Sequence, residues 1–179
     1  GTGASDGLVV GISASEDALV WNHENQSILF GTNNVEAARF DSSGSLLVSK
    51  TSTSVSVAGV VISDTQGVRS TVDGNVPLLL NRLTSDGNLI DLRKSGTTVG
   101  VIGASGDDLV IGTGDTGIHF HDGVDSLIPW NVSTSNYRDA AISFGTSTYR
   151  YLDVYLSGGV FLGGTSSANK ISDYAQGNW

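Results

Sequence analysis

The chain has 179 residues, none of them cysteine or methionine, and its formal net charge at pH 7 is −9. The lack of cysteine excludes a disulfide framework and thiolate chemistry, and the acidic balance makes nucleic acid and anionic lipid unsuitable partners. No apolar run approaches the roughly 20 residues that a membrane-spanning helix needs, so we expect no membrane insertion. Because the initiator Met is missing, we expect a fragment or a processed product.

Glycine is abundant and bulky side chains are scarce, since the chain has 24 glycines and aromatic residues make up only 7% of it. This composition provides many turns but little side-chain volume for a hydrophobic core within one chain. We therefore expect the apolar faces to be buried against further copies of the same chain.

The first part of the chain alternates short β-branched or leucine-rich runs with polar turns, which is typical of strands in tight succession. The turn at residues 41–44 combines an aspartate that can bond its own backbone with a glycine that tolerates positive φ. Residues 50–56 form a polar spacer and the predicted module boundary. Strands are expected at 7–12, 18–21, 27–31, 37–41 and 46–48.

The middle of the chain is predicted to be an antiparallel meander, because its connections are too short for the crossover that parallel strands require. Asp86-Gly87 is a strong hairpin signal between two of its strands. The expected strands are 60–62, 76–83, 89–93 and 99–102.

In the last part, residues 148–156 show the clearest alternation, and on a strand Tyr149, Tyr151 and Tyr155 would share one face. The other expected elements are strands at 108–112 and 160–162, an insertion at 114–127, a loop at 133–140 and a short helix within 166–175.

One stretch of the sequence occurs twice. Ile28 aligns without a gap on Ile142, and Phe30-Gly31-Thr32 aligns on Phe144-Gly145-Thr146. Trp21-Asn22 precedes the first copy as Trp130-Asn131 precedes the second, and we interpret the tryptophan as a core anchor in both. The predicted division is an N-terminal β module (1–52), a central β-meander (53–107) and a C-terminal β module (108–179) that repeats the first and ends in a short tail.

Candidate catalytic groups are sparse. Glutamate occurs only at Glu16, Glu24 and Glu36, and most aspartates stand in glycine-flanked turns, where they bond the backbone. No Gly-x-Ser-x-Gly nucleophile motif and no Gly-Lys-Ser/Thr phosphate motif occurs. We predict a non-enzymatic protein without catalytic residues, while polysaccharide cleavage by two carboxylates distant in sequence stays open as an alternative.

Five stretches of the sequence carry Gly/Ser/Asp-rich motifs in a characteristic order. The first runs from Phe30-Gly-Thr-Asn-Asn to Arg39-Phe-Asp-Ser-Ser-Gly-Ser-Leu-Leu-Val48, and others follow at 77–88, 111–117, 156–164 and 169–174. Together these stretches resemble segments of bacteriophage tail fibre and tail-spike-like virion proteins. The resemblance implies an all-β, elongated homotrimeric fibre segment of short antiparallel strands with little helix. A β-prism and an intertwined triple β-structure both fit this description.

The same resemblance implies a function. We expect a structural component of a phage tail fibre or tail spike, located on the virion and outside the cell, which contributes to host attachment as a non-enzymatic trimer. Its expected partners are two sibling chains, other tail or virion proteins, and a host surface glycan or receptor. Two alternatives stay open: a carbohydrate-binding β-sandwich module, and a catalytic or non-catalytic fragment of a polysaccharide depolymerase.

His119 and His121 are separated by one residue, so on a strand they would point to the same side. In a threefold assembly they would place six imidazoles on the axis, an octahedral site for a divalent transition metal, and trimeric phage fibres can use His-x-His in this way. The alternative is a solvated loop strand with Ile118 and Phe120 facing the core. Apart from this candidate site, no cofactor is predicted.

Tyr149, Tyr151 and Tyr155 are the candidate carbohydrate or receptor contacts. Their common face would serve either as a packing face between chains or as a platform on which sugar rings stack.

Overall fold

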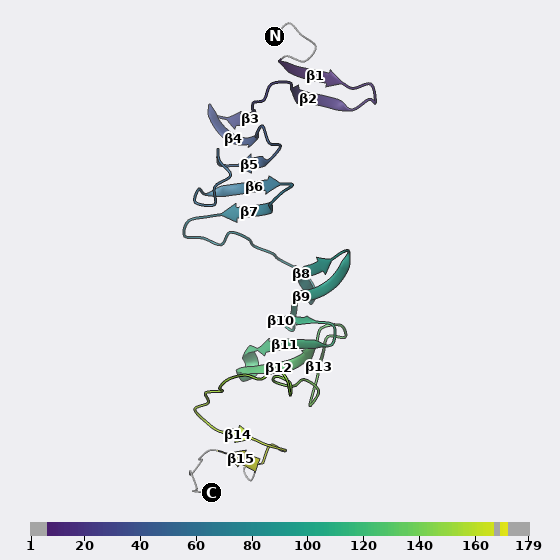
Figure 1. Cartoon of the computed structure of the whole chain (residues 1–179), viewed down its shortest axis with the longest axis vertical. Helices are drawn as coiled ribbons and strands as arrows, with labels where there is room; N and C mark the ends of the chain where they lie inside the picture. The colour runs from purple at the N-terminus through teal and green to yellow at the C-terminus, as the bar shows by residue number, and fades with distance from the viewer. Residues whose placement is uncertain (1–6, 167–168, 172–179) are drawn as a thin grey trace. The chain divides into compact units, whose positions relative to one another are not determined.

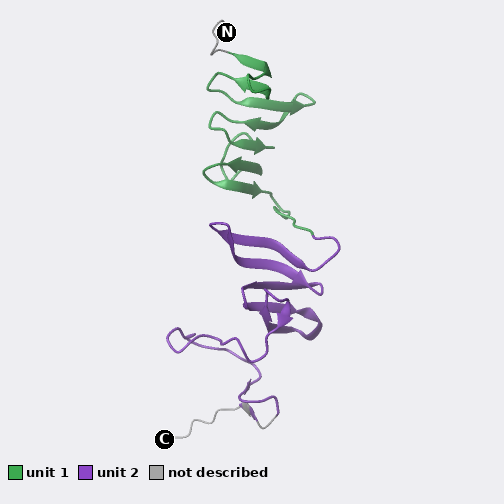
Figure 2. Ribbon diagram, turned by 90° about the vertical axis from the view of Figure 1, so that its right-hand side faces the viewer, with its two compact units in different colours: residues 1–81 green, residues 82–179 purple. Residues whose placement is uncertain are grey.

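The computed structural model describes residues 7–166 and 169–171, and the described chain is built from short antiparallel strands and turns (Figure 1). The predicted all-β class is therefore confirmed. The chain divides into two compact units, residues 1–81 and residues 82–179, which Figure 2 shows in green and purple.

Unit 1 contains a hairpin and a five-stranded sheet, in which every strand is antiparallel to the next strand along the chain. The hairpin consists of β1 (Leu8–Ile12) and β2 (Ala18–Asn22), and the sheet consists of β3 (Ile28–Thr32), β4 (Val35–Phe40), β5 (Leu46–Val48), β6 (Gly59–Ser63) and β7 (Gly67–Thr71).

Unit 2 contains a six-stranded sheet with the same sequential antiparallel order, followed by a small two-stranded sheet. The larger sheet consists of β8 (Gly87–Lys94), β9 (Thr97–Ser105), β10 (Asp108–Thr113), β11 (Thr116–His121), β12 (Ser126–Asn131) and β13 (Asn136–Tyr137), with the 3-10 turn η1 (Asp122–Val124) between β11 and β12. The smaller sheet pairs β14 (Val160–Phe161) with β15 (Lys170–Ile171).

Local turn chemistry explains why the strands follow one another so closely. The β9–β10 connection has only Gly106 and Asp107 between paired strand ends, and both have positive φ, +59° and +70°. This is the two-residue hairpin turn whose twist matches that of the flanking strands. In the β4–β5 turn, Asp41 Oδ1 accepts hydrogen bonds from the amides of Ser43 and Ser45, each at 2.9 Å, which confirms the predicted aspartate turn.

The five-stranded sheet of unit 1 buries only a small set of residues on one face. Leu47 and Val61 are paired across β5 and β6 and are 1% and 0% exposed. In the same cross-strand row, β4 contributes Arg39 and β7 contributes Arg69. The covered face is therefore narrow, with two apolar side chains flanked by arginines.

The opposite face of this sheet is apolar and uncovered by the chain. Its side chains alternate with Leu47 and Val61 along the strands, and the Phe30 and Phe40 rings make an edge contact with centroids 6.3 Å apart. We call it open face 1: Phe30, Phe40, Val48, Ile62 and Val68, which are 38% to 71% exposed.

The large sheet of unit 2 repeats this arrangement. Cross-strand pairs join Leu109 to Phe120, Ile111 to Ile118, and Phe120 to Leu127. We call this open face 2: Leu109, Ile111, Ile118, Phe120 and Leu127, which are 39% to 66% exposed. The alternate residues of the same strands face the other way, and Val110, His119 and Trp130 among them are buried.

The polar spacer at 50–56 is a loop within one sheet, because β5 before it pairs directly with β6 after it. Lys50 is buried, and its Nζ donates hydrogen bonds to the carbonyl oxygens of Ser54 and Val57, each at 2.8 Å. Gly59 has φ +127°, and a Cβ there would lie 2.5 Å from the Val48 carbonyl oxygen. The loop is thus closed by the buried Lys50 ammonium and by Gly59, where any side chain would clash with the backbone.

The module boundaries expected from the duplication do not coincide with breaks in the sheets. The boundary at 52 and 53 falls inside the β5–β6 connection, and the boundary at 107 and 108 falls between the paired strands β9 and β10. The three-module division stays a prediction about the repeated sequence, while the two compact units of the structure meet between residues 81 and 82.

The predicted strand at 76–83 is wrong, as is the hairpin at Asp86-Gly87. Residues 76–83 pair with no strand, and β8 begins at Gly87. Asp86 Oδ2 instead accepts a hydrogen bond at 2.9 Å from the amide of Gly106 in the β9–β10 turn. The Asp86 side chain therefore bonds to the β9–β10 turn and does not form a turn at residues 86 and 87.

The predicted strand at 148–156 is also wrong, since these residues contain no strand. The chain forms a local turn there, in which Thr146 N donates to Tyr149 O at 2.8 Å and Tyr149 N donates to Thr146 Oγ1 at 2.9 Å. An alternating segment needs a partner strand to become a sheet, and none lies alongside.

Smaller differences concern elements that were not predicted. The predicted insertion at 114–127 contains β11, η1 and the start of β12. Strand β7 was also not predicted. Within the predicted helix at 166–175, residues 170–171 form strand β15, while residues 167–168 and 172–175 lie outside the described part of the chain.

Replacement of the buried lysine tests the loop closure. We expect Lys50→Met to lower the free energy of unfolding by about 1–3 kcal/mol, because two carbonyl oxygens lose a charged donor. The exposed Lys94 provides the control, and Lys94→Met should change stability far less. Chemical denaturation of both variants measures the difference, and equal losses would show that the Lys50 ammonium does not hold the loop.

Candidate functional site

The two histidines of β11 point to the same side of the sheet, as predicted, and they meet a carboxylate from the neighbouring strand. Val110 pairs with His119, so the register places Asp108 opposite His121. Asp108 Oδ2 lies 3.1 Å from His119 Nε2 and 3.3 Å from His121 Nδ1. One carboxylate oxygen therefore contacts both imidazoles.

Aromatic rings shield this cluster from solvent. The centroid of the His119 ring lies 4.7 Å from that of Trp130 and 5.5 Å from that of Tyr137. The His119 ring also stacks on His121, with centroids 5.2 Å apart. His119 is only 3% exposed and Asp108 is 8% exposed, whereas His121 is half-buried. The polar atoms thus lie on the side of the sheet opposite open face 2, beneath an aromatic cover.

Asp108 is held as a carboxylate. The amide of Asp122 donates to its Oδ1 at 3.2 Å, and this hydrogen bond is the main reason that the pKa of Asp108 is lowered, with the neighbouring imidazoles adding a smaller effect in the same direction.

The two imidazoles are close to Asp108 but are not aligned with it. His119 Nδ1, His119 Nε2 and His121 Nδ1 are buried atoms that make no hydrogen bond within the described chain. His119 Nε2 and His121 Nδ1 lie close enough to Asp108 for an ion pair, but neither is oriented to make a hydrogen bond with it. Buried polar atoms without a partner are uncommon in native folds and call for an explanation.

Three residues of the cluster have the composition of a metal site. Asp108, His121 and Asp122 each offer one ligand atom, and these atoms lie within 4.8 Å of one another. The aspartates come from the start of β10 and from η1, and the histidine ends β11. Nitrogen and carboxylate donors together suit borderline divalent cations.

The sequence singled out His119 and His121 but not the two aspartates, which look like ordinary turn residues. The position of the β10–β11 turn is the sequence signal that could have identified Asp108. A hairpin folded about Gly114 and Asp115 places residue 108 opposite residue 121. Ile118 and Phe120 do not face a core formed by this chain, since both belong to open face 2.

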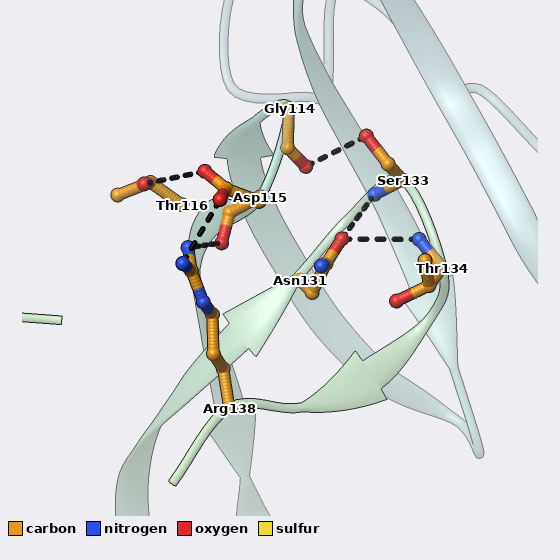
Figure 3. A network of polar contacts seen from close by, with 7 residues as sticks. All are labelled: Gly114, Asp115, Thr116, Asn131, Ser133, Thr134 and Arg138. Atoms are coloured by element: carbon orange, nitrogen blue, oxygen red, sulfur yellow. Dashed lines mark hydrogen bonds and ion pairs between the residues drawn. The ribbon is translucent and has the colours of Figure 1, made fainter. Parts of the chain in front are cut away.

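The β10–β11 turn and the β12–β13 turn are tied together by a polar network (Figure 3). Ser133 donates to the Gly114 carbonyl oxygen through both its amide, at 3.0 Å, and its hydroxyl, at 2.8 Å. Arg138 Nη2 lies 2.9 Å from Asp115 Oδ2, and the same guanidinium donates to the Asp115 carbonyl oxygen. The network fixes the β12–β13 hairpin, and with it Tyr137, against the β10–β11 turn.

Asn131 shapes the hairpin within this network. Its Oδ1 accepts hydrogen bonds from the amides of Ser133 and Thr134 at 3.0 and 3.1 Å, as the dashed lines in Figure 3 show. This Asx turn allows β13 to follow β12 directly.

The candidate receptor contacts Tyr149, Tyr151 and Tyr155 are all exposed, but they do not form the alternating face that a strand would give them. Tyr151 stacks on Phe144 with ring centroids 3.9 Å apart and an interplanar angle of 11°. The exposed ring pair remains a candidate surface for sugars or protein.

The repeated tryptophan has different surroundings in its two positions. Trp130 is 4% exposed and anchors the covered face of unit 2, as predicted, whereas Trp21 on β2 is 56% exposed. The prediction of a core anchor in both copies is therefore wrong for Trp21 within a single chain.

Comparison with protein-family models, curated proteins and solved structures finds no match for this chain. Among the described residues, no helix has the length and apolar character to span a membrane.

Removal of the Asn131 side chain tests the network in Figure 3. We expect Asn131→Ala to lower the free energy of unfolding by about 1 kcal/mol, because two amides lose their acceptor. Thr134→Ala is the matched control, since Thr134 takes part through its backbone amide, which the substitution retains. Thermal and chemical denaturation measure both variants, and an Asn131→Ala protein as stable as the control would contradict this role.

Proposed function

We propose that this chain is a segment of a homotrimeric phage tail fibre or tail spike that contributes to host attachment without enzymatic activity. The observation that carries the proposal is the pair of open faces, one on each large sheet, whose apolar side chains the chain itself does not cover. Exposed apolar surface of this extent indicates an interaction surface.

The magnitude of the exposed surface supports an assembly. The chain exposes 14205 Å², whereas a compact monomer of its 18.5 kDa mass exposes roughly 8,000 Å². An interface between two domains of one chain buries roughly 600–1,500 Å², so packing of the two units on each other would not remove the difference. Contact with further chains would bury part of the remainder.

Copies of the same chain are the occupants that fit best. The two open faces lie on sheets of the same sequential antiparallel type, and symmetry-related copies of the chain would offer the same apolar surface to each of them. The resemblance to tail fibre proteins supports three copies, with each sheet forming one side of a three-sided interior. A β-sandwich module is less well supported, because a sandwich covers one face of each sheet with a second sheet and leaves no apolar face open.

A trimer would also present three copies of the exposed segment with Tyr149, Tyr151 and Tyr155. Weak contacts from each copy to a host glycan or receptor would then combine into a high avidity. The location that follows from the proposal is the virion surface, in contact with other tail proteins.

The mass of the purified chain in solution tests the assembly. Light scattering after size exclusion should give three times the 18.5 kDa chain mass. The double variant Ile111→Thr, Ile118→Thr removes apolar volume from open face 2 while it keeps β-branched residues in the strands. We expect this variant to dissociate at protein concentrations at least about tenfold higher than the unmodified chain, because each methyl group lost from a buried face costs about 1 kcal/mol.

Val124→Thr provides the control, since Val124 is exposed on η1 and lies outside open face 2. Circular dichroism should show unchanged β-structure in both variants. A native chain that stays monomeric over the micromolar range, or a double variant that assembles as well as the control, would contradict the proposal.

A further inference from the structure

The histidine cluster plays no part in the open faces, because it lies on the opposite side of the same sheet. Its atoms have two unusual properties together: a buried carboxylate contacts two imidazoles, and three buried ring nitrogens make no hydrogen bond. These properties indicate a ligand for the cluster rather than a role in packing alone.

We propose that Asp108, His121 and Asp122 bind one divalent transition-metal cation of the zinc class within each chain. The three residues supply one nitrogen and two oxygen donors, and water completes the coordination. Zinc accepts this set of donors in a four-coordinate site with an open position.

The alignment of His121 with Asp108 favours a bound cation over a simple ion pair. A protonated imidazole next to Asp108 would direct an N–H at the carboxylate, but neither His119 nor His121 does so. A nitrogen that coordinates a metal directs a lone pair at the cation, so the N–H alignment with Asp108 is not required.

Binding of a cation would require only a small movement of the three ligand atoms. Ligand atoms that bind one zinc at about 2.0–2.1 Å lie at most about 4 Å apart, and the three ligand atoms already lie within 4.8 Å of one another. Asp122 is exposed and can turn its carboxylate towards the other two ligands. A shallow groove lined by His121, Asp122 and Asp125 provides access from solvent.

The site differs from a metal on a threefold axis. All its ligands come from one chain, so it binds one cation per chain whatever the oligomeric state. Its effect would be to join the start of β10, the end of β11 and η1, and so to fix the connection that leads into β12.

The test uses the full chain, freed of metal with a chelator and titrated with zinc in a calorimeter. We expect one zinc per chain, and cobalt in place of zinc should give a visible absorption band from low coordination. His121→Gln and Asp122→Asn should each weaken zinc binding about tenfold or more. Asp122 is exposed and its backbone amide, which holds Asp108, is unchanged in the variant, so this protein is expected to fold normally.

Asp125→Asn is the matched control. It removes the same charge from the same connection, three residues away, at a position with φ +52° that asparagine tolerates, and it should leave zinc affinity within about twofold. The proposal is overturned if zinc does not bind stoichiometrically, if one zinc binds per three chains, or if Asp125→Asn weakens binding as much as Asp122→Asn.

Discussion

The structure depends on the uneven distribution of apolar residues between the two faces of each large sheet. Because side chains alternate along a strand, a sheet buried on one face normally hides its apolar set there. In this chain, the covered faces contain arginines in unit 1 and histidines with an aspartate in unit 2, while the large apolar side chains of open faces 1 and 2 are exposed. The polar clusters and the open apolar faces are therefore separate.

This separation would allow one sheet to carry both proposed roles. The side chains from Leu109 to Leu127 on open face 2 are exposed, while Val110, His119 and Trp130 on the other face are buried. Trp130 and Tyr137 cover His119 on the inner side. A metal at this inner cluster would strengthen the hairpins without altering the outer surface.

Local sequence signals predicted the elements whose pairing is set by nearby residues. The strands around the Asp41 turn and the β8–β9 hairpin were found in this way, because a short turn fixes the register of both neighbours. The segment at 148–156 alternates clearly and the segment at 76–83 is rich in leucine, yet neither forms a strand. Alternation describes which side chains share a face, and it does not reveal whether another strand lies alongside.

The candidate site could be predicted only in part for a similar reason. The spacing of His119 and His121 placed both on one side of a strand, as the structure has them. Asp108 and Asp122 come from other elements, and their role follows from the hairpin register and from the backbone of η1. Neither residue differs in its sequence context from the many aspartates that only shape turns.

Solvent protection of the phenylalanines on the open faces tests the central claim most directly. Hydroxyl-radical footprinting of the native protein, read by mass spectrometry, compares Phe40 and Phe120 with Tyr149, which lies outside both open faces. If copies of the chain cover the open faces, Phe40 and Phe120 will be protected in the assembled protein and will become reactive when it is dissociated. Reactivity of both phenylalanines in the native protein equal to that in the dissociated chain would contradict the account.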